Sequence, residues 1–427
     1  MRLESISQLY TIFQQHPVVT TDSRNVVAGS IFFALKGDRF NANAYALSAL
    51  EQGCAYAVID EQCYEQDDRF LLVDDVLLTL QKLANFHRRH LGTPVIGITG
   101  TNGKTTTKEL IASVLKQKYR ILYTQGNLNN HIGVPLTLLK LNATHEMAVV
   151  EMGASHPGEI ALLCDIAAPD YGIITNVGKA HLEGFGSFEG VKNTKAELYR
   201  YIAENGKCIF LNEKNDYLCD MARKAGVADR AVAYTKGQMV SSSPFLELNC
   251  EVDGQEIFVK TNLIGSYNTE NVLAAVTIGN YFGIPVEQIK SGLEGYVPQN
   301  NRSQFVETGK NRLIVDAYNA NPTSMAMAVK NFSQIEAAKK LLILGDMLEL
   351  GDQSEGEHQK IVDLLASEGL DEALFVGSQF MKSNHKNQAF KDIDSLAAYL
   401  QEKNYKGYYI LIKGSRGIRL EKVIELL

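Results

Sequence analysis

The stretch PVIGITGTNGKTTTK, residues 94–108, decides how this chain is organised. Its first residues are apolar and β-branched, and they predict a short buried strand. Glycines at 97, 100 and 103 then allow the backbone to turn tightly. Lys104 and three threonines follow and open an amphipathic helix with apolar residues at 110, 111, 114 and 115.

A strand, a glycine loop, Lys-Thr and a helix form an arrangement that binds phosphates. Backbone N–H groups and the helix N-terminus face the anion, and we expect Lys104 to reach the β- and γ-phosphates. A hydroxyl such as that of Thr105 can ligate Mg²⁺. An ordinary glycine-rich turn is the alternative. The favoured interpretation is nucleotide binding by Gly100, Thr101, Asn102, Gly103, Lys104, Thr105 and Thr106.

The composition limits the class of protein. A chain of 427 residues, 45% hydrophobic and 21% charged, predicts two or three globular domains. Its net charge of −7 argues against a broad nucleic-acid-binding surface. Six scattered cysteines without a C-x-x-C pair favour reduced thiols rather than disulfides or zinc. No signal peptide or membrane-spanning run is apparent, so we expect a cytoplasmic protein without membrane insertion.

The spacing of the loop departs from a strict P-loop, which has glycine five positions before the Gly-Lys pair. Ile98 stands there, and Gly97 lies one residue earlier. The form G-x-T-G-T-N-G-K-T-T resembles the Mur ligases and the folylpolyglutamate synthases. The resemblance implies an enzyme that uses ATP to join an amino acid or peptide to a carboxylate.

The order of predicted strands and helices indicates an α/β protein. Residues 1–82 predict a small α/β domain, residues 83–297 a mostly parallel sheet with helices on both faces, and residues 298–427 a Rossmann-like domain. The resemblance implies UDP-sugar binding for the first domain and ATP binding for the second. It implies a third domain that closes on ATP and on the second substrate.

Polar turns flank the first predicted strand, at residues 31–35. Taken alone, they are typical of solvated loops. The string TDSRNVVAGSIFFALKGDRFNANAY, residues 21–45, resembles the UDP-binding domain of the Mur ligases. The resemblance implies contacts to uracil and diphosphate by Ser23, Arg39 and Asn41.

Two predicted strands end in residues suited to a metal. The strand at 147–151 ends in Glu151, and His181 follows the strand at 171–175. Ligands gather at the carboxyl ends of parallel strands, and Mg²⁺ prefers oxygen ligands. A lone histidine is more often a surface residue. The strings EMGASHPGEI and ITNVGKAHLEGFGS resemble family segments, which implies that both Glu151 and His181 hold Mg²⁺.

Lys195 falls on the apolar stripe of the helix predicted at 188–203, with Val191, Leu198 and Ile202. A buried lysine has a depressed pKa and becomes nucleophilic enough to take up CO₂ as a carbamate. The resulting anion could hold a second Mg²⁺, and the K-x-E context is similar to carbamylated family members. A lysine that contacts phosphate or reaches solvent is the alternative. The expected catalytic residues are Lys104, Glu151, His181 and Lys195.

The remaining candidates line later loops. The asparagine-rich string GNLNNHIGVPLTLL, residues 126–139, predicts either turns or substrate contacts by Asn127, Asn129 and Asn130. By resemblance, Asn271 lies at the adenine and Asp316 at the ribose. Arg302 is expected to reach the phosphates, although PQNNR at 298–302 lacks the glycine of the family pattern Pro-x-Gly-Arg. The resemblance places Tyr318, Asn319 and Asn321 at the peptide site.

Within the family, the strings GNLNNHIGVPLTLL, AHLEGFGS, YNANPTSM and GDMLELG resemble the member that adds D-alanyl-D-alanine to UDP-N-acetylmuramoyl-tripeptide. The resemblance implies an acyl-phosphate mechanism with ATP and two Mg²⁺ ions, in a monomer acting in peptidoglycan synthesis. A sister ligase adding one amino acid, or a polyglutamylase, is the nearer alternative. A P-loop ATPase without an acceptor is more distant, because Ile98 breaks the strict spacing.

Overall fold

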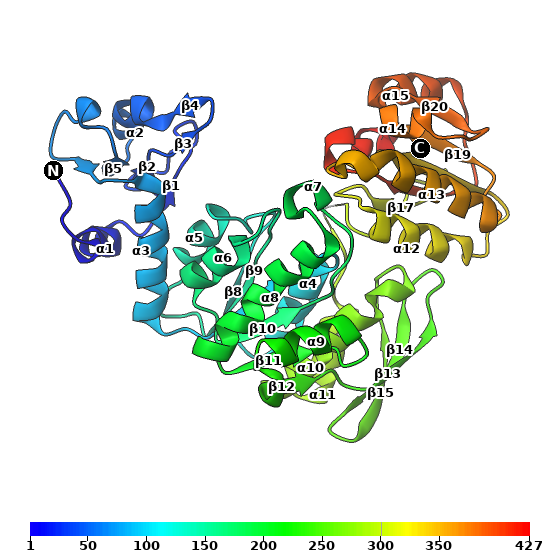
Figure 1. The fold of residues 1–427 in the computed structure, drawn as a ribbon, viewed down its shortest axis with the longest axis horizontal. Coiled ribbons are helices and arrows are strands. Elements are labelled where there is room, and N and C mark those ends of the chain that lie inside the picture. Colours follow the sequence, from blue (N-terminus) through cyan, green and yellow to red (C-terminus); the bar gives the residue numbers. More distant parts are fainter. Residues whose placement is uncertain (300) are drawn as a thin grey trace.

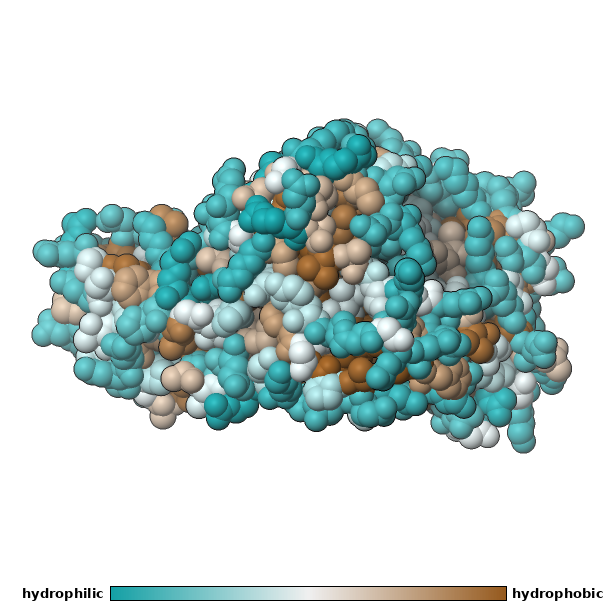
Figure 2. Space-filling view, turned by 90° about the horizontal axis from the view of Figure 1, so that it is seen from below, coloured by the Kyte–Doolittle hydropathy of each residue, from teal (hydrophilic) through white to brown (hydrophobic). Residues whose placement is uncertain are grey.

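The computed structural model describes residues 1–299 and 301–427, and its central domain lies between the other two (Figure 1). Asn300, in the string before Arg302, is outside the described residues. All three domains combine a β-sheet with helices, which confirms the predicted α/β class and the three-domain arrangement. None of the described helices is long and apolar enough to cross a membrane. The face in Figure 2 is mostly hydrophilic, with apolar residues in scattered groups.

The first domain contains a four-stranded parallel sheet in the order β1-β2-β5-β6. The apolar run at 31–33 makes β2 fully buried. A two-stranded hairpin, β3 with β4, carries the loop expected to bind the UDP-sugar. The elements are α1 (Ile6–Gln15), β1 (Val19–Thr20), β2 (Ile31–Phe33), β3 (Lys36–Gly37), β4 (Phe40–Asn41), η1 (Ala42–Tyr45), α2 (Ala46–Glu51), β5 (Tyr56–Ile59), η2 (Gln62–Tyr64) and β6 (Phe70–Leu72).

Helix α3 (Val76–Leu91) connects the first and central domains (Figure 1). It begins at an N-cap, Asp75, which accepts from the amide of Leu78, and it ends where Gly92 takes a left-handed backbone with φ +66°. Its apolar face packs into one core that includes residues of both domains. The expected domain limit between 82 and 83 falls inside α3, and these limits stay a prediction.

The central domain holds a six-stranded parallel sheet in the order β12-β11-β10-β7-β9-β8. Alternate residues of β7 face opposite cores: Val95 packs with α6 and α8, whereas Ile96 and Ile98 pack with α4 and α10. The strands are β7 (Val95–Thr99), β8 (Ile121–Tyr123), β9 (Met147–Glu151), β10 (Tyr171–Ile174), β11 (Cys208–Leu211) and β12 (Ala231–Ala233). The helices are α4 (Lys104–Leu115), α5 (Gly133–Leu138), α6 (Glu159–Ala167), α7 (Leu182–Phe185), α8 (Phe188–Asn205), α9 (Asp216–Lys224), η3 (Ala228–Arg230), η4 (Ser266–Asn268), α10 (Thr269–Tyr281) and α11 (Val286–Glu294).

A three-stranded antiparallel sheet interrupts this pattern between β12 and α10, and it projects from the central domain (Figure 1). Its strands are β13 (Gly237–Ser241), β14 (Glu247–Val252) and β15 (Gln255–Lys260). β14 alternates buried Leu248, Cys250 and Val252 with more exposed residues, as a half-covered strand does.

The third domain has a six-stranded sheet in the order β16-β17-β21-β18-β19-β20, parallel except for the edge strand β16. Its elements are β16 (Gln304–Glu307), β17 (Arg312–Asp316), α12 (Pro322–Ser333), β18 (Lys340–Gly345), η5 (Gly351–Gln353), α13 (Ser354–Ser367), β19 (Ala373–Val376), α14 (Ser378–Lys382), β20 (Gln388–Phe390), α15 (Ile393–Glu402), β21 (Tyr409–Lys413), η6 (Arg416–Ile418) and η7 (Leu420–Leu426). Helices cover both faces of the sheet. A site can therefore form only at an edge, and in such sheets it forms at the carboxyl ends of the central strands.

Candidate active site

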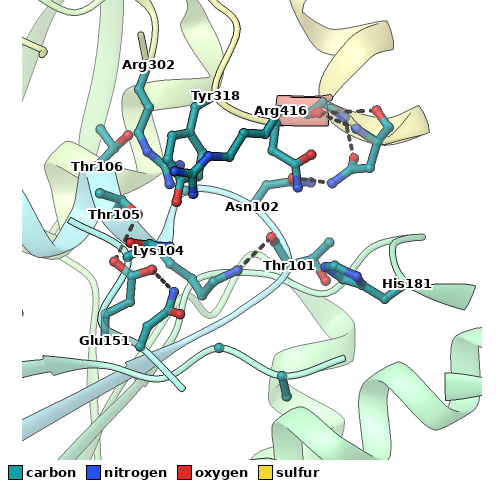
Figure 3. A pocket seen from close by; sticks show the side chains of 18 of the residues that line it. Thr101, Asn102, Lys104, Thr105, Thr106, Glu151, His181, Arg302, Tyr318 and Arg416 are labelled. Atoms are coloured by element: carbon teal, nitrogen blue, oxygen red, sulfur yellow. Dashed lines mark hydrogen bonds between the residues drawn. The ribbon is translucent and has the colours of Figure 1, made fainter. Parts of the chain in front are cut away.

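A cavity of about 730 Å³ lies where strand ends of the central and third domains meet. The central domain contributes residues that follow β7, β9 and β10, and the third domain contributes residues that follow β17, β18 and β21. Figure 3 shows side chains from both domains pointing into this space. Of the predicted residues it brings together Thr101, Asn102, Gly103, Lys104, Thr105, Thr106, Asn127, Asn129, Asn130, Glu151, His181, Asn271, Arg302, Asp316, Tyr318, Asn319 and Asn321.

The glycine loop is shaped for a bound anion. Gly100 has φ +146°, and a Cβ there would stand 2.0 Å from Oγ1 of Thr175. Gly103 precedes α4 with φ +77°, and no side chain caps this helix end, so the first amides of α4 stay open. The side-chain nitrogen of Asn102 is buried without a hydrogen-bond acceptor among the described residues. Unsatisfied donors around a tight loop suit phosphate oxygens.

Lys104 lies inside this loop. Its Nζ donates to the carbonyl of Gly100 over 2.7 Å. It also donates to that of Thr101 over 3.0 Å (Figure 3). Burial lowers the pKa of Lys104 to about 8; the charge of Glu151 opposes this shift and that of Arg302 adds to it. A phosphate beside Lys104 would favour its charged form.

Glu151 ends β9 and is only 1% exposed. Its Oε2 accepts from the hydroxyl of Thr105 over 2.9 Å, and its Oε1 accepts from the amide of Asn129 over 2.8 Å. Thr105 and Glu151 together offer the hard oxygen donors that Mg²⁺ prefers. The described residues contain no group of three His, Cys, Asp or Glu side chains able to hold a metal. Mg²⁺ here would therefore need phosphate and water as further ligands.

His181 lines the same cavity, but its Nδ1 is paired with Glu349 of the third domain. Both residues have left-handed backbones, with φ +49° and +64°. The hydrogen bond from His181 lowers the pKa of the Glu349 carboxyl. In this arrangement His181 serves a contact between two domains.

Lys195 is buried on α8, 2% exposed, and it does not line the cavity. Its Nζ lies 5.5 Å from the ring centroid of Phe185. Burial, together with the charge of Lys104, lowers the pKa of Lys195 to about 7, against the opposing charges of Glu159 and Glu197. Lys192, off the apolar stripe, instead forms an ion pair with Glu189. Lys195 therefore points inward from α8, as the helical spacing predicts.

The third-domain wall contains ordered polar contacts. Nζ of Lys413 lies 2.5 Å from Oδ2 of Asp316. The guanidinium of Arg302 stacks 3.6 Å from the ring centroid of Tyr318. Asn321 caps α12 in a capping box with Ser324.

The predicted asparagines of the central domain differ in whether they are already hydrogen-bonded within the protein. Oδ1 of Asn130 accepts from the amide of Gly133 over 2.8 Å, as turn chemistry requires, whereas Asn127 is exposed in the cavity. Asn271 accepts from the hydroxyl of Thr107 over 3.0 Å and donates to Asn268 over 2.8 Å. These bonds fix Asn271 against α4.

The three residues predicted in the first domain do not line this cavity. Arg39 is exposed at the tip of the β3–β4 hairpin, and Ser23 lies in the turn after β1. Asn41 donates to Glu61 over 2.9 Å. The roles of Ser23, Arg39 and Asn41 remain predictions.

Sequence reasoning missed two residues at or near the cavity, Lys108 and Glu349. It noted Arg416 only as positive charge after a predicted strand, with a solvated loop as the alternative. Lys108 is fully buried, and its Nζ lies 3.9 Å from Oε2 of Glu151. Its position on α4, three and seven residues before the apolar Ile111 and Leu115, could have indicated an inward lysine.

Two family models match the chain. The Mur ligase middle domain matches residues 98–279, and the model described as Mur ligase, glutamate ligase domain matches residues 301–416. Both matched segments contribute walls of the cavity.

Similar proteins match over nearly the whole chain. The UDP-N-acetylmuramoyl-tripeptide–D-alanyl-D-alanine ligase of Bacillus subtilis is 36% identical over 95% of this chain and 92% of the relative. The Escherichia coli enzyme of that name is 34% identical, over 96% and 93%. A crystal structure of MurF from Acinetobacter baumannii superposes with a TM-score of 0.88 at 31% identity, covering 99% of this chain and 98% of that one. The MurF ligase of Thermotoga maritima, solved in complex with ADP, gives 0.85 at 27% identity, covering 96% and 97%.

Proposed function

The chain belongs to the Mur ligase family, and we propose that it uses ATP to join D-alanyl-D-alanine to the terminal carboxylate of UDP-N-acetylmuramoyl-tripeptide. One observation carries this proposal. The phosphate loop, the Glu151 carboxylate, whose oxygens suit Mg²⁺, and the asparagines of the third domain face one cavity. The relatives that bear this activity in their names match over nearly the whole length of the chain.

The chemistry requires an activated carboxylate, because a carboxylate does not form an amide at neutral pH. The terminal carboxylate of the tripeptide attacks the γ-phosphate of ATP, giving an acyl-phosphate and ADP. The free amine of the dipeptide then attacks the acyl carbon and loses a proton. The bond between that carbon and the phosphate oxygen breaks, and phosphate is released. The protein contributes mainly positioning and charge stabilisation.

The nucleotide is bound by residues on both walls. Loop amides and Lys104 hold the β- and γ-phosphates, and Arg302 reaches them from the third domain. Asp316 holds the ribose, and Asn271 lies at the adenine. Gly100, Thr101, Asn102, Gly103 and Thr106 complete the loop. The unsatisfied nitrogen of Asn102 supports this assignment.

Mg²⁺ would be held by Thr105 and Glu151, whose oxygens already lie within hydrogen-bond distance of each other. When bound, it neutralises charge that develops on the phosphates. His181 would join a second ion through Nε2, because its Nδ1 is paired with Glu349. The catalytic set is Lys104, Glu151, His181 and Lys195.

Lys195 would be carbamylated: its neutral Nζ adds to the carbon of CO₂ and loses a proton, which leaves an anion for the second ion. Its burial and low pKa support this step. Incubation with ¹³C-bicarbonate should give a carbamate carbon signal in the wild type by NMR. Lys195→Ala should lack that signal.

The peptide substrates occupy the remaining polar surface. Asn127, Asn129 and Asn130 contact the tripeptide, and Tyr318, Asn319 and Asn321 contact the dipeptide. Ser23, Arg39 and Asn41 hold the UDP part in the first domain, residues 1–82. Residues 83–297 bind ATP and residues 298–427 close on it. We expect a cytoplasmic monomer.

Acceptor dependence tests the proposal. Phosphate release from ATP and Mg²⁺ is measured with UDP-N-acetylmuramoyl-tripeptide plus either the dipeptide or single amino acids, and the product is weighed by mass spectrometry. Release only with the dipeptide, with a product heavier by one dipeptide less water, is expected. Release with a single amino acid would assign the chain to a sister ligase. Release without an acceptor would contradict the ligase proposal.

A further inference from the structure

A fully buried histidine is bonded to the loop that carries Glu349. His358 lies on the second turn of α13 and is 0% exposed. Its Nε2 accepts from the backbone N–H of Met347 over 2.9 Å, and its Nδ1 donates to the carbonyl of Ser354 over 2.7 Å. The two bonds require a hydrogen on Nδ1 and a lone pair on Nε2, so the ring is neutral. Burial, which lowers the pKa of His358, favours the same form.

The loop at 346–350 needs such support. It follows β18 and contains no helix or strand. Met347 is bonded to the buried histidine, and the amide of Leu348 donates to Oγ of Ser415 over 2.9 Å. These bonds hold the two residues directly before Glu349, whose φ of +64° is uncommon for a residue with a side chain. The direction of the Glu349 carboxylate therefore depends on how the preceding backbone is anchored.

The third domain touches the central domain through both elements that this histidine joins. From the loop, Glu349 pairs with Nδ1 of His181. From α13, Oε1 of Glu357 lies 3.7 Å from Nζ of Lys179. His358 follows Glu357 in the helix and is bonded to the loop. The two contacts between the domains are thus connected through one buried side chain.

The other neighbours of His358 do not require it to be charged. Oδ1 of Asp346 lies 3.7 Å from Nε2. However, the Asp346 oxygens already accept from the amides of Gln379 and Phe380, both over 2.9 Å. The ring of Phe380 packs edge-on against His358, with 4.6 Å between the ring centroids. The bond to the loop, rather than an ion pair, is what the imidazole contributes.

We propose that His358 is a positioning residue, which holds the 346–350 loop on α13 so that Glu349 meets His181 across the domain boundary. The inference rests on the proposed function, in which His181 joins a metal ion through Nε2. Because Glu349 is paired with Nδ1, it fixes the imidazole of His181 with Nε2 free for that role. His358 does not line the cavity and acts only through the loop.

A double-mutant cycle separates positioning from stability. His358→Phe keeps an aromatic ring against Phe380 but leaves the N–H of Met347 without its acceptor. It should lower kcat/KM for the dipeptide about 10-fold, as for one lost hydrogen bond. In a Glu349→Gln background the same change should lower it less than about twofold, because the contact that His358 positions is already weakened. The midpoint of urea unfolding should fall equally in both backgrounds.

Two further variants complete the cycle. His358→Gln keeps an acceptor on a side chain of similar reach, so it should recover at least half of the lost kcat/KM. Leu365→Ala is the matched control, since Leu365 is also buried on α13 but lies two helical turns further along. It should lower the urea midpoint while kcat/KM stays within about twofold of the wild type. Equal kinetic losses from His358→Phe in both backgrounds, or none in either, would overturn the inference.

Hydrogen exchange of the free protein tests the positioning without any substrate. The amides of residues 346–350 should exchange at least about 10-fold faster in His358→Phe than in the wild type, and so should those around His181. Wild-type exchange rates in both segments would overturn the inference even if the ligase reaction were confirmed. Faster exchange in a protein that forms no product with the dipeptide would support the positioning role and reject the proposed function instead.

Discussion

The side-chain amide of Asn321 donates to the side-chain oxygen of Asn102 over 2.7 Å. This bond joins the N-cap of α12 in the third domain to the phosphate loop of the central domain. The pair of His181 with Glu349, and Lys179 at 3.7 Å from Glu357, connect the same two domains. The position of the third domain is thus coupled to the residues that would bind ATP.

Asn321→Ser tests the contact with Asn102 separately from the cap. Serine preserves the N-cap, so the free energy of unfolding should change by less than about 0.5 kcal/mol. The shorter side chain cannot reach Asn102, and kcat/KM for the dipeptide should fall about 5- to 10-fold, as for one lost hydrogen bond. Steady-state kinetics and urea unfolding provide the two readouts. An unchanged kcat/KM would show that the contact has no part in catalysis.

Glu349→Gln should weaken closure of the third domain, because the amide keeps the shape of the carboxylate but loses its charge at His181. With an ATP analogue and both substrates, small-angle scattering should show compaction of the wild type and less compaction of the variant. Glu355→Gln, an exposed charge at the start of α13, should compact like the wild type. Equal compaction of all three proteins would exclude a closing role for Glu349.

Lys195 should make stability depend on pH. Its folded pKa of about 7 lies below the unfolded value near 10.4, so the unfolded state binds the proton more tightly. The cost of burying the charge is complete below pH 7 and falls as pH rises toward 10. In bicarbonate-free buffer, the wild type should gain about 2 kcal/mol of stability over Lys195→Met between pH 7 and pH 9.

Urea unfolding at the two pH values measures this difference. Lys192→Met is the control, because Lys192 lies on the same helix but forms a surface pair with Glu189. It should retain the pH dependence of the wild type. If the free energies of unfolding of Lys195→Met and the wild type changed equally with pH, burial would not penalise the charged form of Lys195 in the folded protein.

Lys108 should stabilise the buried carboxylate of Glu151. Its Nζ also donates to the carbonyl of Thr124 over 2.5 Å. Lys108→Met removes the only cation within 4.0 Å of Glu151 among the described residues, and it should cost about 3 kcal/mol. Adding Glu151→Gln should recover part of this loss. Lys116→Met, at the exposed C-cap of α4, should cost far less. Additive losses in the double variant would contradict the coupling.

The local parts of the site could be predicted from the sequence. The strand, glycine loop and helix at 94–108 depend on neighbouring residues alone, and they form as β7 and α4. Glu151 follows from topology, since parallel strands bring their carboxyl ends to one edge. The inward direction of Lys195 follows from helical spacing.

Contacts between domains could not be predicted in this way. Glu349 lies at His181 because of how two sheets meet, which no local pattern encodes. Local sequence does not predict that β13, β14 and β15 pair into one sheet, because the serines and proline at 241–244 interrupt the alternating pattern. Arg416 follows a predicted strand, but that it lines the same cavity as the phosphate loop appears only when both walls of the cavity are in place.

The fate of the carboxylate oxygen tests the central claim most directly. The tripeptide substrate is labelled with ¹⁸O in its terminal carboxylate and incubated with ATP, Mg²⁺ and the dipeptide. Mass spectrometry of the released phosphate should show one heavy oxygen in each phosphate, because the acyl-phosphate transfers that atom when the amide forms. Unlabelled phosphate, with both heavy oxygens still in the substrate, would contradict an ATP-driven ligation through an acyl-phosphate.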